Sequence, residues 1–78
     1  MPAEQGFASV QNNLGVKYYK GKGVPQDYIQ AHMWSNLAAA RGNANGRKNR
    51  DLVAKRMTHA QIAEAQALAR EWLGEHGE

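Results

Sequence analysis

Cysteine is absent from the 78 residues of this sequence. No disulfide framework and no zinc site built from thiolates can therefore reinforce the fold. A chain this short buries only about 60% of the surface that its unfolded form exposes, so its hydrophobic core is thin. The length predicts one compact domain over residues 1–78.

Long apolar runs are absent as well. No segment approaches the ~18 consecutive apolar residues that a membrane-spanning helix needs. Residues 1–6 also lack the order of a signal peptide, in which a basic stretch precedes an apolar one. As given, the sequence predicts a cytoplasmic protein with no membrane segment. This prediction of the compartment would not hold if the sequence were a fragment of a longer secreted protein.

Patterns typical of catalysis and of metal binding are also missing. The segment 21–23, Gly-Lys-Gly, lacks the Ser or Thr of a phosphate-binding loop and the strand that precedes such a loop. The histidines, His32, His59 and His76, are never three or four residues apart, so no helix face pairs two metal ligands. We expect them to be solvated, with His32 on an exposed flank of its helix. The sequence thus predicts no enzyme, no cofactor and no metal site.

Helical periodicity is what the sequence does contain. Asp27 is placed to cap a helix, and Thr58 with Gln61 has the form of a capping box. Gly46 is expected to interrupt the third helix early, and Gly74 to end the fourth. No β-strand alternation is found, so the fold class is all-α, with two antiparallel helix pairs stacked as a short α/α solenoid. Apolar and small residues recur at intervals of three and four, which predicts helices over residues 7–20, 27–41, 44–57 and 58–73.

One combination of residues occurs twice. Ala31 and Trp34, one helical turn apart, recur as Ala69 and Trp72, 38 residues further along the chain. We expect each small Ala to let a neighbouring helix approach, and each indole to fill the space beside it. Such self-similarity indicates a solenoid unit that is repeated about twice.

The first of the two units has an ordered pattern along its length: Ala8-x-x-Gln11-x-x-Leu14-Gly15-x-x-Tyr18-Tyr19-x-Gly21-x-Gly23-Val24-Pro25-Gln26-Asp27-Tyr28-x-x-Ala31-x-x-Trp34-x-x-x-Ala38-Ala39-x-x-Gly42. This pattern resembles a Sel1-like repeat, a relative of the tetratricopeptide repeat. In the second unit Arg50 and Asp51 stand where Leu14 and Gly15 stood, and the glycine-rich loop is absent. The resemblance implies one complete repeat over residues 6–42 and a degenerate C-terminal capping helix pair over residues 43–74.

The resemblance also implies a function. Family members form an α/α superhelix, whose first helices line a concave groove for protein partners, and they usually act as adaptors or scaffolds, often in bacteria. Tyr19 is expected to be exposed there and to anchor a peptide, beside amide and ammonium donors. An ordinary polar surface is the alternative. In this sequence the groove would be lined by Ser9, Asn12, Val16, Tyr19, Lys20, Asn45, Lys48, Leu52 and Lys55.

The charge and the small number of repeats suggest several kinds of partner. The net charge of +3 and the basic cluster Arg47–Arg56 favour either an ordinary solvated face or a site for an acidic protein partner. Nucleic acid is a less favoured alternative, because the charge is modest and both indoles have the spacing of core residues. A structural role is another, in which the chain caps or dimerises a longer array. With barely two repeats, nothing is expected to cover Phe7 and Val10 at the N-terminal edge, which predicts a symmetric homodimer.

Overall fold

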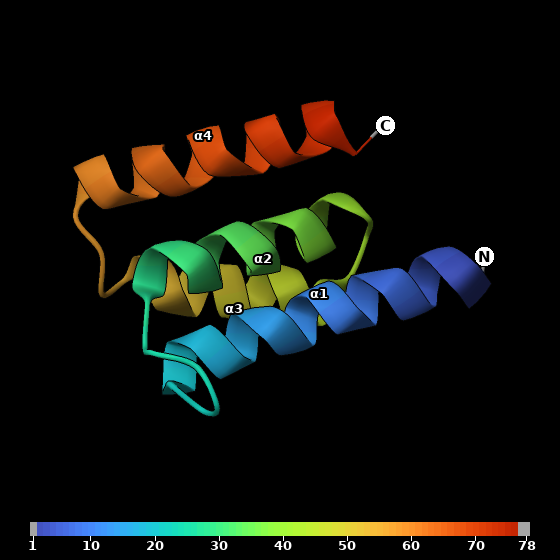
Figure 1. The fold of residues 1–78 in the computed structure, drawn as a ribbon, viewed down its shortest axis with the longest axis horizontal. Coiled ribbons are helices and arrows are strands. Elements are labelled where there is room, and N and C mark those ends of the chain that lie inside the picture. The colour runs from blue at the N-terminus through green and yellow to red at the C-terminus, as the bar shows by residue number, and fades with distance from the viewer. Residues whose placement is uncertain (1, 77–78) are drawn as a thin grey trace.

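The structure is a computed structural model and describes residues 2–76, with the side chains of residues 6–76. Over these residues the chain forms the helices α1 (Pro2–Lys20), α2 (Tyr28–Ala40), α3 (Ala44–Ala54) and α4 (His59–Glu75). Successive helices run antiparallel, and α2 lies between α1 and α4, with α3 behind it (Figure 1). The predicted all-α solenoid of two helix pairs is confirmed.

Capping residues determine where the later helices begin. The Asp27 side chain accepts a hydrogen bond from the backbone N–H of Gln30 at 3.1 Å. Thr58 and Gln61 form the complete capping box, with bonds of 2.9 and 3.1 Å. Both predictions are therefore confirmed. Asn43 caps α3 in the same way, although the sequence analysis did not identify it.

The ends of two helices differ from the prediction. α1 begins at Pro2 rather than near Phe7, because proline fits the first turn of a helix, where its missing N–H leaves no bond unmade. α4 continues through Gly74 to Glu75, because Gly74 does not adopt the positive φ with which a glycine commonly ends a helix. Neither difference alters the order of the helices.

The turn between α1 and α2 has the backbone conformation expected of its glycines. Gly21 and Gly23 have φ angles of 69° and 81°, in the left-handed region that other residues rarely adopt. The Gln26 side chain donates to the carbonyl oxygen of Tyr19 at 2.8 Å and fastens the loop to the end of α1. The segment is a turn, as predicted.

Small residues bring α1 and α3 unusually close to α2. Gly46 does not interrupt α3, contrary to the prediction, because only glycine fits there. A Cβ atom at position 46 would lie 2.7 Å from Cβ of Ala38 and 2.9 Å from the backbone nitrogen of Ala39. On α1, a Cβ atom at position 15 would lie 2.5 Å from Oγ of Ser35. Both glycines therefore serve close packing.

Larger side chains join α4 to α2. The indoles of Trp34 and Trp72 meet edge to face, with ring centroids 5.8 Å apart. Ala31 and Ala69, one turn before them, are fully buried. The expected pairing of small and large residues in the two units is confirmed. Around these rings the core consists of Met33, Leu37, Leu68, Ala69 and Leu73.

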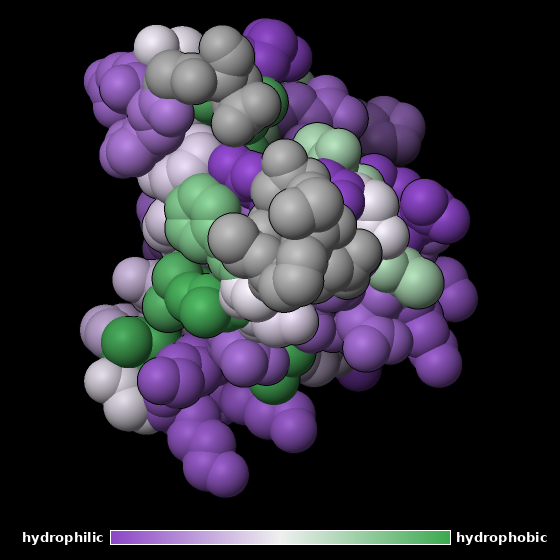
Figure 2. All heavy atoms as spheres, turned by 90° about the vertical axis from the view of Figure 1, so that its right-hand side faces the viewer, coloured by the Kyte–Doolittle hydropathy of each residue, from purple (hydrophilic) through white to green (hydrophobic). Residues whose placement is uncertain are grey.

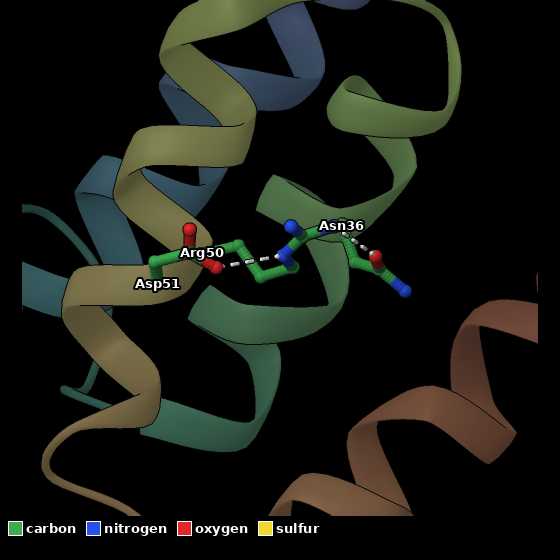
Figure 3. A network of polar contacts seen from close by, with 3 residues as sticks. All are labelled: Asn36, Arg50 and Asp51. Atoms are coloured by element: carbon green, nitrogen blue, oxygen red, sulfur yellow. Dashed lines mark hydrogen bonds and ion pairs between the residues drawn. The ribbon is translucent and has the colours of Figure 1, made fainter.

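His32 is buried between helices, and the prediction of a solvated side chain is wrong. Its exposed fraction is 3%, because α3 packs against the flank of α2 that carries it. Burial lowers the pKa of His32, and the positive charge of Arg50 lowers it further, while Asp51 acts in the opposite direction. Arg50 reaches from α3 to Asn36 on α2 at 3.3 Å and also pairs with Asp51 at 3.2 Å (Figure 3).

Candidate protein-binding groove

A pocket of about 260 Å³ lies between α1 and α3, and we call it the α1–α3 groove. Gly15 and Ser35, which are buried, form its deep side, whereas Leu52 remains 46% exposed at its edge. Gly15 and Gly46 let α1 and α3 approach α2 closely, and the groove lies between these two helices. Its lining residues are Gly15, Val16, Tyr19, Lys20, Ser35, Asn49, Leu52 and Val53.

The structure brings together part of the predicted binding face. Val16, Tyr19, Lys20 and Leu52 line the groove. Asn12 lies beside it, since its Oδ1 accepts a hydrogen bond from Nδ2 of the lining residue Asn49 at 3.0 Å. The remaining predicted residues do not line the groove and lie exposed on α1, on α3 or directly after it: Ser9, Asn45, Lys48 and Lys55.

Tyr19 is half-buried rather than exposed, which corrects the expectation of a free aromatic anchor. The first turn of α2 brings Tyr28 alongside it, with ring centroids 5.8 Å apart. The guanidinium of Arg56 lies near both tyrosine side chains, and its pKa is raised, chiefly by its electrostatic interaction with Tyr19. Tyr19 is therefore a fixed wall of the groove.

Asn49 is the functional candidate that the sequence analysis missed. It stands between Lys48 and Arg50 in the basic cluster, where it has no distinctive neighbour in sequence. Its position three and four residues before Leu52 and Val53 places all three on adjoining faces of α3. That spacing could have identified Asn49 as part of the groove. Its hydrogen bond to Asn12 could not have been predicted, because Asn12 lies 37 residues away in the sequence.

Positive charge surrounds the groove, and the described carboxylates lie elsewhere. Lys20 is part of the lining, and Arg56 lies near the Tyr19 wall. Asp27 caps α2, and Asp51 pairs with Arg50. The other described carboxylates are on α4: Glu64, Glu71 and Glu75.

The outer face of α1 carries a second hollow of about 410 Å³. Val10, which is 53% exposed, lines it together with Leu14. Hydrophobic side chains gather on one flank of the end of the molecule where the two termini lie (Figure 2). Phe7 also stays exposed at 41%, as expected, although α4 folds back and covers part of it. Its ring lies 6.0 Å from that of Trp72 and 4.4 Å from the guanidinium carbon of Arg41.

Two classes of feature are not found in the part of the chain that the structure describes. No described helix is both long enough and apolar enough to cross a bilayer. Residues 2–76 also contain no group of three His, Cys, Asp or Glu side chains that could hold a metal ion.

Comparisons with known proteins agree with this geometry. The Sel1 repeat family matches residues 8–43. Among solved structures, the chain is similar to c5321, a protective antigen present in uropathogenic Escherichia coli strains that displays a Sel1-like repeat (SLR) fold. The TM-score is 0.83 and the sequence identity 36%, over 92% of this chain but only 16% of that chain. No curated protein matches the sequence. Sel1-like repeats in general mediate protein–protein interactions and are typically not catalytic. Residues 8–43 are therefore a Sel1 repeat, and the chain around them has the Sel1-like repeat fold.

Proposed function

We propose that the chain is a non-enzymatic adaptor that binds a segment of another protein in the α1–α3 groove. The observation that carries this proposal is the groove itself, where Val16 and Tyr19 of α1 meet Leu52 of α3. Leu52 is one of the large apolar side chains that remain exposed, and it borders a hollow. Exposed apolar surface beside a concavity is typical of interaction sites.

We also propose that the second helix pair closes the end of the solenoid. In this proposal residues 6–42 form the complete repeat and residues 43–74 the capping pair. α4 buries Ala65 and Ala69 against α2, while it exposes Glu64, Arg70 and Glu71 to solvent. A polar outer face is what a terminal unit of a solenoid requires.

Selection of peptides tests the groove. A displayed library of random linear peptides is selected against the wild-type chain, and the affinities of the recovered peptides are measured for Leu52→Ser and Val10→Ser. Both residues are apolar and about half exposed, at 46% and 53%, but only Leu52 lines the groove. We expect Leu52→Ser to weaken binding about tenfold or more. Recovery of no binder, or equal effects of the two variants, would contradict the proposal.

A second candidate function is self-association through the outer face of α1. The hollow beside Val10 and Leu14 favours it, because a two-fold axis would bury these side chains against a second copy. Val10→Asp tests this better than a change at Phe7, which packs against Trp72 within the chain. The expected result is a wild-type dimer that dissociates in the variant with unchanged helix content. A monomeric wild type at high micromolar concentration in sedimentation experiments refutes it.

Nucleic-acid binding through the cluster Arg47–Arg56 is the weakest alternative. Arg50 is engaged with Asn36 and Asp51 and is not available to phosphates in this arrangement. Both indoles are partly buried against the core, which makes them poor stacking platforms for bases. Titration with DNA and RNA at increasing salt concentration distinguishes this function, because phosphate contacts produce a steep salt dependence.

A further inference from the structure

We infer that the α1–α3 groove is an anchor pocket, which takes one large apolar side chain from an acidic segment of the partner and pairs Lys20 with a carboxylate of that segment. This inference rests on the proposed function and adds the chemistry of the partner. It concerns what the groove recognises, whereas the proposed function concerns only where binding occurs.

The size of the groove fits a side chain. A volume of about 260 Å³ is below the ~300–1,000 Å³ of pockets that hold a cofactor or a drug-sized molecule. Its lining is mainly apolar and includes the side chains of Val16, Leu52 and Val53. At the bottom, position 15 carries no side chain, because the helix contact excludes one. An apolar side chain of the partner therefore finds an apolar cavity of matching scale.

The walls of the groove are held in place before a partner binds. Tyr19 packs against the ring of Tyr28, with ring centroids 5.8 Å apart. On the other side, the bond between Asn12 and Asn49 joins α1 to α3 at 3.0 Å. Such pre-organisation reduces the conformational entropy that binding would otherwise remove, so a single anchor contributes more of its contact energy.

Charge identifies the segment that carries the anchor. Lys20 is the one ionisable cation in the lining, and no carboxylate is part of it. Lys48 and Lys55 add exposed positive charge on α3 and directly after it. An acidic segment is attracted by this potential, whereas a basic one is repelled. Neither Asp27 nor Asp51 lines the groove, and the charge of Asp51 is offset by its pairing with Arg50.

Lys17 provides a matched control for Lys20. Both are basic residues in the last turn of α1, and both are exposed. Lys17 lines the hollow on the outer face, whereas Lys20 lines the groove. Lys17→Glu and Lys20→Glu therefore change the net charge and the end of the helix equally, but they differ at the groove.

The probes are the selected peptides and two altered forms of each, measured by fluorescence anisotropy. One form replaces Asp and Glu by Asn and Gln, and the other replaces each apolar residue in turn by Ala. We expect selected peptides rich in Asp and Glu, about 3–10-fold weaker binding to Lys20→Glu than to Lys17→Glu, and a loss that shrinks at high salt. We also expect one Ala replacement to weaken binding about 30-fold.

The outcomes separate the two proposals. If Leu52→Ser weakens binding but Lys20→Glu and Lys17→Glu are equal, or the selected peptides are not acidic, the groove binds protein segments and the present inference is wrong. The same holds if no single apolar residue of the peptides is required. If Leu52→Ser and Val10→Ser are equal, the proposed function itself is wrong. Circular dichroism of every variant confirms that helix content is unchanged.

Discussion

Replacing Gly46 by Ala should destabilise the protein, although helix propensity predicts the opposite. Within a helix, Ala is more favourable than Gly by about 1 kcal/mol, because glycine loses more backbone freedom on folding. At position 46, however, the new Cβ would lie 2.7 Å from Cβ of Ala38 and 2.9 Å from the backbone oxygen of Ser35. Backbone atoms of α2 cannot move aside as a flexible side chain does, so α3 must shift as a whole.

The magnitude follows from two opposing terms. Overpacking of a close contact costs about 1–3 kcal/mol, and the gain in helix propensity offsets about 1 kcal/mol of it. We expect Gly46→Ala to lower the free energy of unfolding by up to about 2 kcal/mol, because the cost of overpacking exceeds the gain in helix propensity. For a domain of this size each kcal/mol corresponds to a change in Tm of about 4–8 °C.

Gly6 is the control for this substitution. It also lies within a helix, α1, but a Cβ atom there would have no neighbour within 4 Å. Gly6→Ala should therefore raise the free energy of unfolding by about 0.5–1 kcal/mol. Urea denaturation followed by circular dichroism measures both variants. A Gly46→Ala variant as stable as Gly6→Ala would show that α3 does not approach α2 as closely as described.

Three further predictions concern the core, the turn and the buried histidine. Trp34→Ala and Trp72→Ala should each cost about 3–5 kcal/mol, because either truncation leaves a cavity where the two indoles meet, and a wild-type Tm in either variant would rule out this core. Gly23→Val should lower the free energy of unfolding by about 1–3 kcal/mol, because the φ of 81° at this position is strained for a β-branched residue. An unchanged urea midpoint would show that residue 23 does not have a positive φ. The lowered pKa of His32 means that the unfolded chain binds a proton before the folded one does, so stability should be lost as pH falls below the ordinary value of 6.5. The urea midpoint measured across that range should fall less in His32→Leu than in wild type, whereas His59→Gln, at an exposed residue, should behave as wild type does.

Local interactions account for what the sequence alone could predict about the fold. Asp27 and Thr58 cap helices through bonds to residues three positions away, so their effect is visible within one turn of sequence. The turn glycines act through their own φ angles. The repetition of the paired Ala and Trp residues along the chain indicated two similar units, whereas the structure shows that the two indoles meet. These features are enough to predict four helices and their order.

Contacts between helices decided the rest, because burial depends on which residues from distant parts of the chain meet. His32 looks like a surface residue on its own helix, and it is buried only because α3 covers that flank of α2. Gly46 looks like a helix breaker until Ala38 is found against it. Phe7 is partly covered by Trp72, which lies near the other end of the sequence. In the groove, the sequence predicted the faces of α1 and α3, but not the bond from Asn12 to Asn49 or the fixed position of Tyr19. Periodicity specifies a face of a helix, whereas only tertiary packing specifies what that face meets.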